Sequence, residues 1–132
     1  MSLLLDTCVF LWLLGLPESL PDKLRKLLED ADTRCAVSTA SLWESLLKHG
    51  KGHLDFKTAD KTALDFLLWN CERHTLEVLP IRAETLRPLE RLPAIHADPF
   101  DRLLICQAIE EGMILVTPDP AIRRYPIRTL WD

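Results

Sequence analysis

Short apolar runs alternate along the chain with longer segments in which apolar residues recur at helical spacing. The runs have the length and composition of buried strands, and the last one, after Tyr125 and Pro126, predicts a short edge strand. The expected strands span residues 3–5, 35–38, 76–79, 113–116 and 127–130.

Helices are predicted between these strands by apolar spacing and by residues that start or stop helices. They span about residues 7–14, 21–32, 38–50, 58–73, 83–91 and 99–112. Thr7 is a candidate cap of the first helix, and Pro99 suits the first position of the last one. Strands that alternate with helices predict a parallel sheet of four to five strands with helices on both faces. At 132 residues the chain suits a single domain, 1–132.

Composition narrows the class of protein. The apolar content of 48% and the charged content of 27% are those of a globular protein, and the net charge of −4 argues against binding nucleic acid through overall charge. The four cysteines form no C-x-x-C pair and mostly lie in apolar runs, which predicts buried thiols in a reducing cytoplasm. The apolar N-terminal stretch contains Asp6 and is too short to span a bilayer, so no membrane partner is expected.

Four acidic residues lie far apart in the sequence, but the predicted fold brings them to one edge. Asp6 follows the first strand and Asp119 follows the fourth, while Glu44 and Asp101 lie in the first turns of helices. In an open parallel sheet the carboxyl ends of the strands and the amino ends of the helices share one edge, where ligands bind. Clustered carboxylates repel one another unless a cation lies between them, and oxygen ligands favour Mg²⁺ or Mn²⁺. The pattern therefore predicts a divalent-metal site.

Each acid also has a structural interpretation, and the sequence leaves it open. Residues 41–44 fit a capping box, and Glu44 and Lys48 are spaced for an i,i+4 ion pair. Asp98, directly before a proline, suits a helix N-cap, and residues 117–120 have the composition of a turn. Because helix amino ends favour acids in general, placement at this edge does not by itself separate capping from metal binding.

Motifs along nearly the whole chain resemble those of one family. They are L-L-D-T at 4–7 with Leu11 and Trp12, V-S at 37–38 leading to S-L-W-E at 41–44 and Lys48, H-A-D-P-F-D-R at 96–102 with Gln107 and Ala108, and L-V-T-P-D at 115–119 with Tyr125. In this order and spacing the chain resembles the PIN-domain ribonucleases, and among them the VapC-type toxins of bacterial type II toxin–antitoxin pairs.

The resemblance implies a particular fold and activity. The implied fold is a three-layer α/β/α sandwich around the parallel sheet, in a single PIN domain. The implied activity is a toxin endoribonuclease that depends on Mg²⁺ or Mn²⁺ and hydrolyses RNA phosphodiester bonds, with tRNA or rRNA as the expected substrate. The implied partners are a small VapB-like antitoxin, which holds the enzyme inactive, and a second copy of the chain in a homodimer.

The resemblance also assigns roles to residues. The family's acidic quartet, with catalytic and metal-binding roles, is matched by Asp6, Glu44, Asp101 and Asp119. Supporting roles fall to Asp98, Thr7, Thr117 and Ser38, of which Ser38 also suits a helix cap. Cys8 departs from the pattern, because many relatives with the same opening have His there.

Other polar and aromatic residues near these motifs have two interpretations each. Arg102 and Lys48 are candidate RNA contacts or structural partners of neighbouring acids. His96 could ligate or donate, but we interpret it as an anchor of its loop. The tryptophans are interpreted as core or partner contacts: Trp12, Trp43, Trp69 and Trp131.

Two alternative functions remain at this point. A receiver-like signalling domain also holds Mg²⁺ at such an edge, but the sequence after the third strand, 79–81, is L-P-I where an acceptor Asp is required. A catalytically silent PIN-like module that only binds a partner would use the acids as caps, with the apolar residues 10–14 as part of its contact surface.

Overall fold

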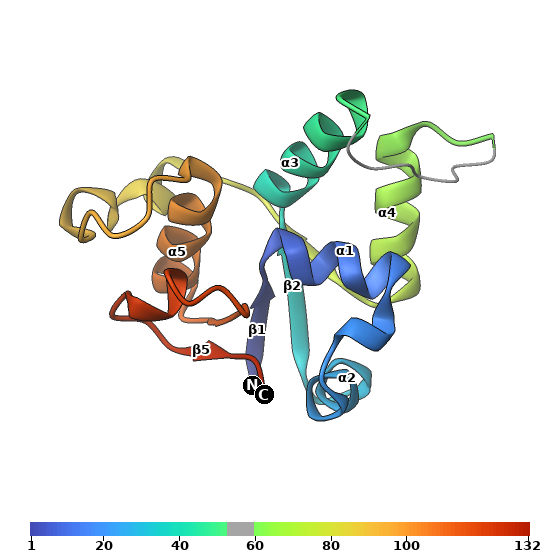
Figure 1. Cartoon of the computed structure of the whole chain (residues 1–132), viewed down its shortest axis with the longest axis horizontal. Helices are drawn as coiled ribbons and strands as arrows, with labels where there is room; N and C mark the ends of the chain where they lie inside the picture. The colour runs from blue at the N-terminus through green and yellow to red at the C-terminus, as the bar shows by residue number, and fades with distance from the viewer. Residues whose placement is uncertain (53–59) are drawn as a thin grey trace.

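A single parallel sheet forms the centre of the computed structural model, which describes residues 1–52 and 60–132 (Figure 1). The strand order is β3-β2-β1-β4-β5, where the strands are β1 (Ser2–Leu5), β2 (Arg34–Ser38), β3 (Glu77–Leu79), β4 (Ile114–Val116) and β5 (Thr129–Leu130). The predicted strands are confirmed, with small shifts at their ends. Receiver-like sheets have the order 2-1-3-4-5, so that alternative is wrong.

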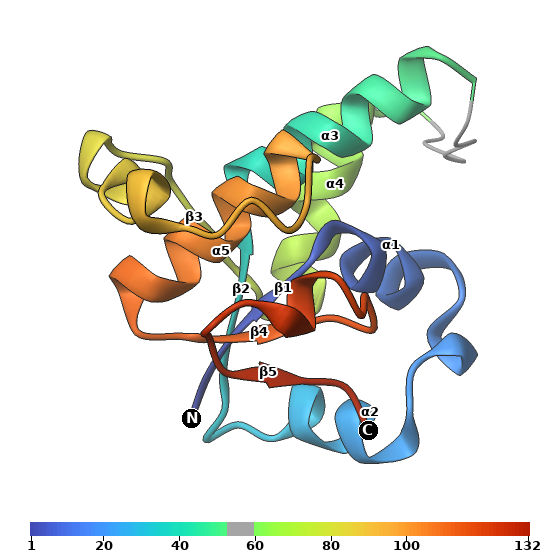
Figure 2. The same cartoon turned by 60° about the vertical axis from the view of Figure 1, so that its left-hand side comes forward.

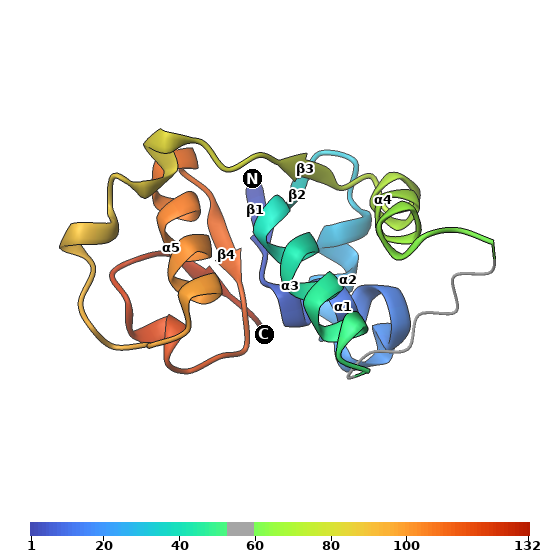
Figure 3. The same cartoon turned by 90° about the horizontal axis from the view of Figure 1, so that it is seen from above.

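Helices cover both faces of the sheet. They are α1 (Thr7–Gly15), α2 (Asp22–Glu29), α3 (Thr39–Gly50), α4 (Ala63–Arg73) and α5 (Pro99–Glu111), with short 3₁₀ turns η1 (Pro17–Ser19), η2 (Ala83–Leu86), η3 (Leu89–Arg91) and η4 (Ile122–Arg124). Figure 3 shows α5 on one side of the strands and α1, α2 and α4 on the other. The predicted three-layer α/β/α sandwich is confirmed.

The alternation of side chains in β1 explains the two layers. Leu3 and Leu5 point into the core shared with α1 and α2, where Phe10 and Leu24 are fully or almost fully buried. Leu4 points the other way, into the core beneath α5. Because a central parallel strand is buried on both faces, it is apolar throughout. None of the helices in the two described ranges is both long enough and apolar enough to cross a bilayer.

Two predicted helices differ from those observed. The helix expected at 83–91 is instead the pair of 3₁₀ turns η2 and η3, because Pro88 has no N–H to donate and its ring disfavours a continuous helix there. The helix expected from residue 58 begins at Ala63, where the Thr62 hydroxyl caps the Asp65 N–H at 3.1 Å. Residues 58 and 59 lie outside the described ranges.

The amino ends of α1, α3 and α5 meet the carboxyl ends of β1, β2 and β4. Figure 2 shows α1 leaving directly from the end of β1 and α3 leaving from the end of β2. α5 packs against both α3 and β4, which places its first turn at this edge. We call this side of the sheet the carboxyl edge and the opposite side the amino edge.

Candidate metal centre

Asp6 leads from β1 into α1 and is 4% exposed. Its Oδ1 accepts the Val9 N–H at 2.8 Å, so Asp6 is the N-cap of α1, and the prediction that Thr7 has this role is wrong. The Thr7 hydroxyl instead donates to the Ser41 hydroxyl at 2.9 Å. Burial raises the pKa of the Asp6 carboxyl above its usual 3.8, against hydrogen bonds from Thr117 and Val9 that lower it. The fold thus holds a carboxylate in an environment that disfavours its charge.

Glu44 lies on α3 with a side chain 13% exposed. Its Oε2 is 3.6 Å from Lys48 Nζ, which confirms the predicted ion pair. The capping box is wrong, because the N-cap of α3 is Ser38, whose hydroxyl accepts the Ala40 N–H at 3.0 Å. Glu44 is therefore too far inside the helix to bond its N-cap, and its Oε1 is buried without a hydrogen-bond partner.

Asp98 and Asp101 have different roles at the start of α5. Asp98 Oδ1 accepts the N–H groups of Phe100 at 2.8 Å and of Asp101 at 3.2 Å, which confirms Asp98 as the N-cap. Asp101 is then not needed as a cap. Burial, followed by the charge of Asp98, raises the pKa of Asp101 to about 6, although His96 lowers it. The charged form of this carboxyl is thus disfavoured, and a cation beside it would relieve that cost.

Asp119 follows β4 in a turn, as predicted. Its Oδ1 accepts the Ala121 N–H at 2.8 Å, and its own N–H donates to the Thr117 hydroxyl at 3.1 Å. The same hydroxyl hydrogen-bonds the Asp6 carboxyl, so the fully buried Thr117 connects the ends of β1 and β4. The Asp119 side chain is 34% exposed, which makes it the most exposed of the four acids.

The four acids act on one another electrostatically. The charges of Asp119 and Glu44 raise the pKa of Asp6, and those of Glu44 and Asp6 raise the pKa of Asp101. The structure therefore brings the predicted quartet within electrostatic range. Such mutual repulsion is relieved by a cation, and the oxygen-rich donor set fits Mg²⁺ or Mn²⁺.

Unpaired polar atoms support this fit. Three buried side-chain polar atoms in the described ranges have no hydrogen-bond partner, and two of them, Glu44 Oε1 and His96 Nε2, lie at this centre. Buried polar groups are normally paired, so an unpaired one calls for a bound group or another explanation. Among the described residues, the group whose ligand atoms all lie within 4.8 Å of one another is His96, Asp101 and Asp119, and Asp6 and Glu44 are not in it. A metal held by this group would give His96 Nε2 a partner.

His96 is a member of the centre that sequence reasoning did not place there. Its Nε2 is 2.8 Å from Asp101 Oδ2 and 3.4 Å from Asp119 Oδ2. One ligand atom from each of these three residues lies within 4.8 Å of the others. His96 is also anchored as predicted, but through its backbone N–H, which donates to the Tyr125 hydroxyl at 2.8 Å. The H-x-D-x-x-D spacing at 96–101 was the available signal.

Cys8 lies near the acids, but its thiol is not in the deprotonated form that binds metals. Burial, then the charge of Asp6, raises the pKa of the thiol to about 11. The thiol is thus protonated near neutral pH, in a position of intermediate exposure. The other three cysteines are buried free thiols, as predicted.

The two basic candidates differ in their surroundings. Arg102 Nη1 donates to the Pro93 carbonyl at 3.0 Å and to the Tyr125 hydroxyl at 3.2 Å, so it holds the loop before α5. The Lys48 side chain is 40% exposed, and Lys48 lines a groove of ≈ 340 Å³ beside Glu44 and Asp98. Of the two cations, Arg102 is thus committed to protein hydrogen bonds, whereas the Lys48 ammonium has only its ion pair with Glu44 in the described part of the chain.

The tryptophans do not share one environment. Trp12 packs on the core with its ring centroid 5.7 Å from that of Trp131, as expected. Trp43 is 56% exposed and Trp69 is 42% exposed, so the core interpretation is wrong for these two. The Trp43 ring meets Phe100 edge-on at 4.9 Å, near the groove beside Glu44.

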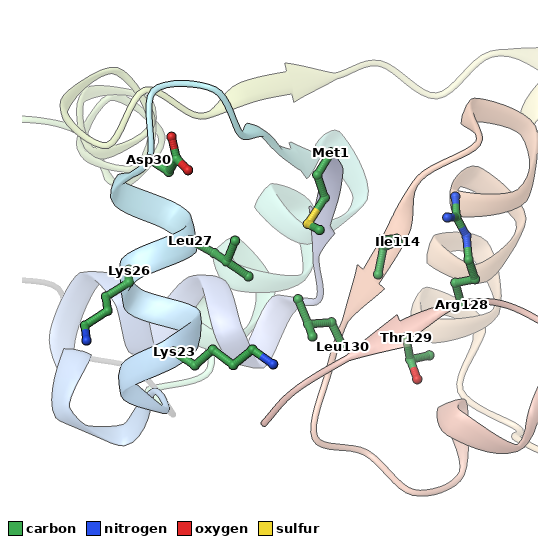
Figure 4. Close-up of a pocket in the computed structure, with 9 residues that line it drawn as sticks. All are labelled: Met1, Lys23, Lys26, Leu27, Asp30, Ile114, Arg128, Thr129 and Leu130. Carbon is green, nitrogen blue, oxygen red and sulfur yellow. The ribbon is translucent and has the colours of Figure 1, made fainter.

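A second, larger hollow lies at the amino edge, between α2 and the β4–β5 pair (Figure 4). We call it the amino-edge cleft; its volume is ≈ 750 Å³ and its lining is Met1, Lys23, Lys26, Leu27, Asp30, Ile114, Arg128, Thr129 and Leu130. Three of these residues are basic and one is acidic, so the cleft offers no cluster of carboxylates. It does not have the composition of a site for a hard cation.

Comparison with known proteins identifies the family. The profile of the PIN domain matches residues 3–127, so the chain belongs to the PIN domain family, whose members are generally nucleases. A search among curated protein sequences gives no significant match.

Solved structures share the fold. VapBC2 from Rickettsia felis, bound to a promoter DNA fragment, is 21% identical with a TM-score of 0.69 and covers 100% of both chains. DNA-bound VapBC from Salmonella typhimurium is 20% identical with a TM-score of 0.63 and covers 98% of this chain and 97% of that one. VapBC-1 from nontypeable Haemophilus influenzae is 16% identical, with a TM-score of 0.63 and the same coverage.

Proposed function

We propose that this chain is a metal-dependent endoribonuclease that acts as the toxin of a toxin–antitoxin pair. It hydrolyses RNA phosphodiester bonds, with tRNA or rRNA as substrate, and a small VapB-like antitoxin holds it inactive in the cytoplasm. The observation that carries the proposal is the convergence of four acids, from four separate segments, at the carboxyl edge, where their charges raise the pKa values of Asp6 and Asp101. Membership of the PIN domain family supports a nuclease, and the fold shared with VapBC complexes supports the antitoxin.

The proposed roles follow from the contacts of each residue. Asp6, Glu44, Asp101 and Asp119 would hold Mg²⁺ or Mn²⁺. When bound, such a cation stabilises negative charge on a phosphodiester under attack and makes hydroxide available near neutral pH. Thr117 orients Asp6 and Asp119 through its hydroxyl, and Asp98 fixes the first turn of α5 so that Asp101 faces the centre.

Substrate contact is assigned to the open side of the centre. Lys48 keeps a partly exposed ammonium group next to Glu44, where it can contact an RNA phosphate. Arg102 is assigned to holding the loop, because its guanidinium is already bonded to Pro93 and Tyr125. Ser38 and Thr7 are assigned to supporting the helices that carry the acids.

A catalytically silent partner-binding module is the second candidate. The observation in its favour is that Asp6, Asp98 and Asp119 all accept backbone N–H groups, as purely structural acids would. It leaves the buried, unpaired Glu44 Oε1 and the burial of Asp101 without a role, because neither acid caps a helix among the described elements.

The test is cleavage by the purified chain, freed of any antitoxin. A panel of tRNAs and rRNA fragments is incubated with Mg²⁺, with Mn²⁺ and with EDTA, and the product ends are mapped. Asp101→Asn is the inactive variant, and Asp30→Asn, an exposed acid of the amino-edge cleft, is the matched control. Metal-dependent cuts with 5′-phosphate ends, lost only in Asp101→Asn, establish the nuclease. A folded, metal-binding chain that cuts no RNA in the panel favours the partner-binding module.

A further inference from the structure

We propose that His96 is a direct metal ligand of this centre, with Asp101 and Asp119, and that its nitrogen makes the centre prefer Mn²⁺ to Mg²⁺. The inference rests on the metal dependence in the proposed function and extends it beyond the acidic quartet. It names a mixed nitrogen and oxygen donor set and the class of cation that such a set selects.

The distances suit ligands of one ion. Two atoms that each lie about 2.1 Å from a metal are roughly 3.0 Å apart at an octahedral right angle and roughly 3.4 Å apart at a tetrahedral angle. His96 Nε2 is 2.8 Å from Asp101 Oδ2 and 3.4 Å from Asp119 Oδ2. Both distances from His96 Nε2 are therefore those of neighbouring ligands, and the ligand atoms of all three residues lie within 4.8 Å of one another.

Hydrogen bonding does not account for the position of the imidazole. His96 Nε2 is buried and has no hydrogen-bond partner, because neither short contact to a carboxylate has hydrogen-bond geometry. A nitrogen within 3.4 Å of two carboxylate oxygens, but without a hydrogen bond to either, suits a ligand of a cation shared with both.

A separate network fixes the backbone of His96. The buried Tyr125 hydroxyl accepts the His96 N–H at 2.8 Å and an Arg102 N–H at 3.2 Å, and Arg102 also donates to the Pro93 carbonyl. The loop is thus tied to the segment after η4 and to α5, independently of the imidazole. Tyr125 and Arg102 are positioning residues, which hold the ring over Asp101 and Asp119.

The chemistry of the ligand decides the selectivity. Mg²⁺ demands oxygen ligands and keeps several waters, whereas imidazole nitrogen suits later divalent metals, and affinity for nitrogen-containing sites rises from Mn²⁺ upward. Loss of the imidazole should therefore weaken Mn²⁺ binding much more than Mg²⁺ binding. Removal of the partner that orients a ligand typically costs about 10- to 100-fold in metal affinity, so loss of the ligand itself should cost at least that.

The experiment measures the metal directly. The full chain, free of antitoxin, is titrated with MnCl₂ and with MgCl₂ by calorimetry, and the Mn²⁺-loaded protein is examined by pulsed electron paramagnetic resonance for coupling to ¹⁴N. The variants are His96→Ala and Tyr125→Phe, and His74→Ala is the control, since His74 follows α4 beside α1 and α2. The backbone N–H of residue 96 remains in His96→Ala, so its bond to Tyr125 is kept.

We expect ¹⁴N coupling in the wild-type chain and in His74→Ala, and its loss in His96→Ala. Mn²⁺ affinity should fall at least about 10-fold in His96→Ala while Mg²⁺ affinity changes less than about 3-fold. Tyr125→Phe should keep the coupling and weaken Mn²⁺ by a smaller factor.

Absence of ¹⁴N coupling in the wild type, or equal losses for both metals in His96→Ala, would overturn the inference. If the chain still cuts RNA in that case, the proposed function stands without His96 as a ligand. If ¹⁴N coupling is present but no RNA is cut, the ligand assignment stands and the proposed function fails. A chain that binds neither metal refutes both.

Discussion

The carboxyl edge and the amino-edge cleft differ in charge and in the way their side chains are held. At the carboxyl edge, Asp6 and Asp119 are fixed by backbone N–H groups and Thr117, Glu44 by Lys48, and Asp101 contacts His96. At the amino edge, the cleft is lined by the basic residues Lys23, Lys26 and Arg128 and by apolar residues that include Leu27 and Leu130 (Figure 4). The cleft has the larger volume, ≈ 750 Å³ against ≈ 340 Å³ for the groove beside Glu44, but it lacks a fixed constellation of groups.

The difference follows from chain direction in a parallel sheet. Every strand delivers its carboxyl end, and every following helix its amino end, to the same edge. Helix amino ends attract and fix carboxylates, as Asp6 and Asp98 show. The amino edge receives helix carboxyl ends and connecting loops, which favour basic side chains. Volume is therefore a poorer guide to chemistry here than the position of the strand ends.

The largest expected effect is a loss of RNA cleavage on substitution of an acid at the carboxyl edge. Asp101→Asn should reduce metal-dependent RNA cleavage at least about 100-fold, because it removes a proposed metal ligand. The melting temperature should stay equal or rise, since Asp101 is not a cap and its buried charge is relieved. Single-turnover cleavage and thermal melting measure the two quantities. Cleavage within about threefold of wild type would remove Asp101 from the centre.

Two substitutions of Asp6 separate capping from metal binding. Asn is as good an N-cap as Asp, whereas Ala costs about 1 kcal/mol. Both Asp6→Asn and Asp6→Ala should lose Mn²⁺ binding, but only Asp6→Ala should also lower the melting temperature, by about 4 °C for a chain of this size. Calorimetric titration and thermal melting distinguish the outcomes. Unchanged metal binding in Asp6→Asn would mean that Asp6 serves only α1.

Asp101 and Asp6 should contribute less to the stability of the metal-free protein as pH rises through the acidic range. Asp101 has a pKa of about 6 in the folded chain against 3.8 ordinarily, and the pKa of Asp6 is raised too, so the folded state binds more protons than the unfolded state between these values. This contribution falls as pH increases from about 4 to about 7, whereas Glu77 and His74, whose pKa values are lowered, act in the opposite direction. Denaturant unfolding of the wild-type chain and of Asp101→Asn at several pH values in EDTA isolates the contribution of Asp101 as the difference between the two. Saturating Mn²⁺ should reverse the slope of that difference, and a difference that does not change with pH would contradict the raised pKa of Asp101.

The smallest effect is expected at the amino-edge cleft. Lys23→Ala and Arg128→Ala alter partly or fully exposed side chains with no ion pair in the described part of the chain, so stability should change by less than about 0.5 kcal/mol. Cleavage should stay within about twofold of wild type. Cleavage assays under the conditions used for Asp101→Asn provide the comparison. A tenfold loss would show that the cleft takes part in RNA binding.

Local pattern predicted much of the fold. Apolar runs identified all five strands, and alternation with helices predicted the parallel three-layer sandwich. Asp98 before Pro99 identified the start of α5 because capping depends on residues that are adjacent in sequence. Two local predictions failed because another local feature was decisive. Apolar spacing fitted a helix at 83–91, but Pro88 interrupts it; residues 41–44 fitted a capping box, but α3 already starts at Thr39.

The sequence alone determined the order of strands and helices along the chain, and so the edge at which Asp6, Glu44, Asp101 and Asp119 would meet. This was possible because the direction of a parallel sheet follows from connectivity. Only the tertiary structure decided how buried each acid is, which acids are caps, and that His96 Nε2 contacts both Asp101 and Asp119. Those properties depend on side chains brought together by packing, through the hydroxyls of Thr117 and Tyr125, which no local pattern connects.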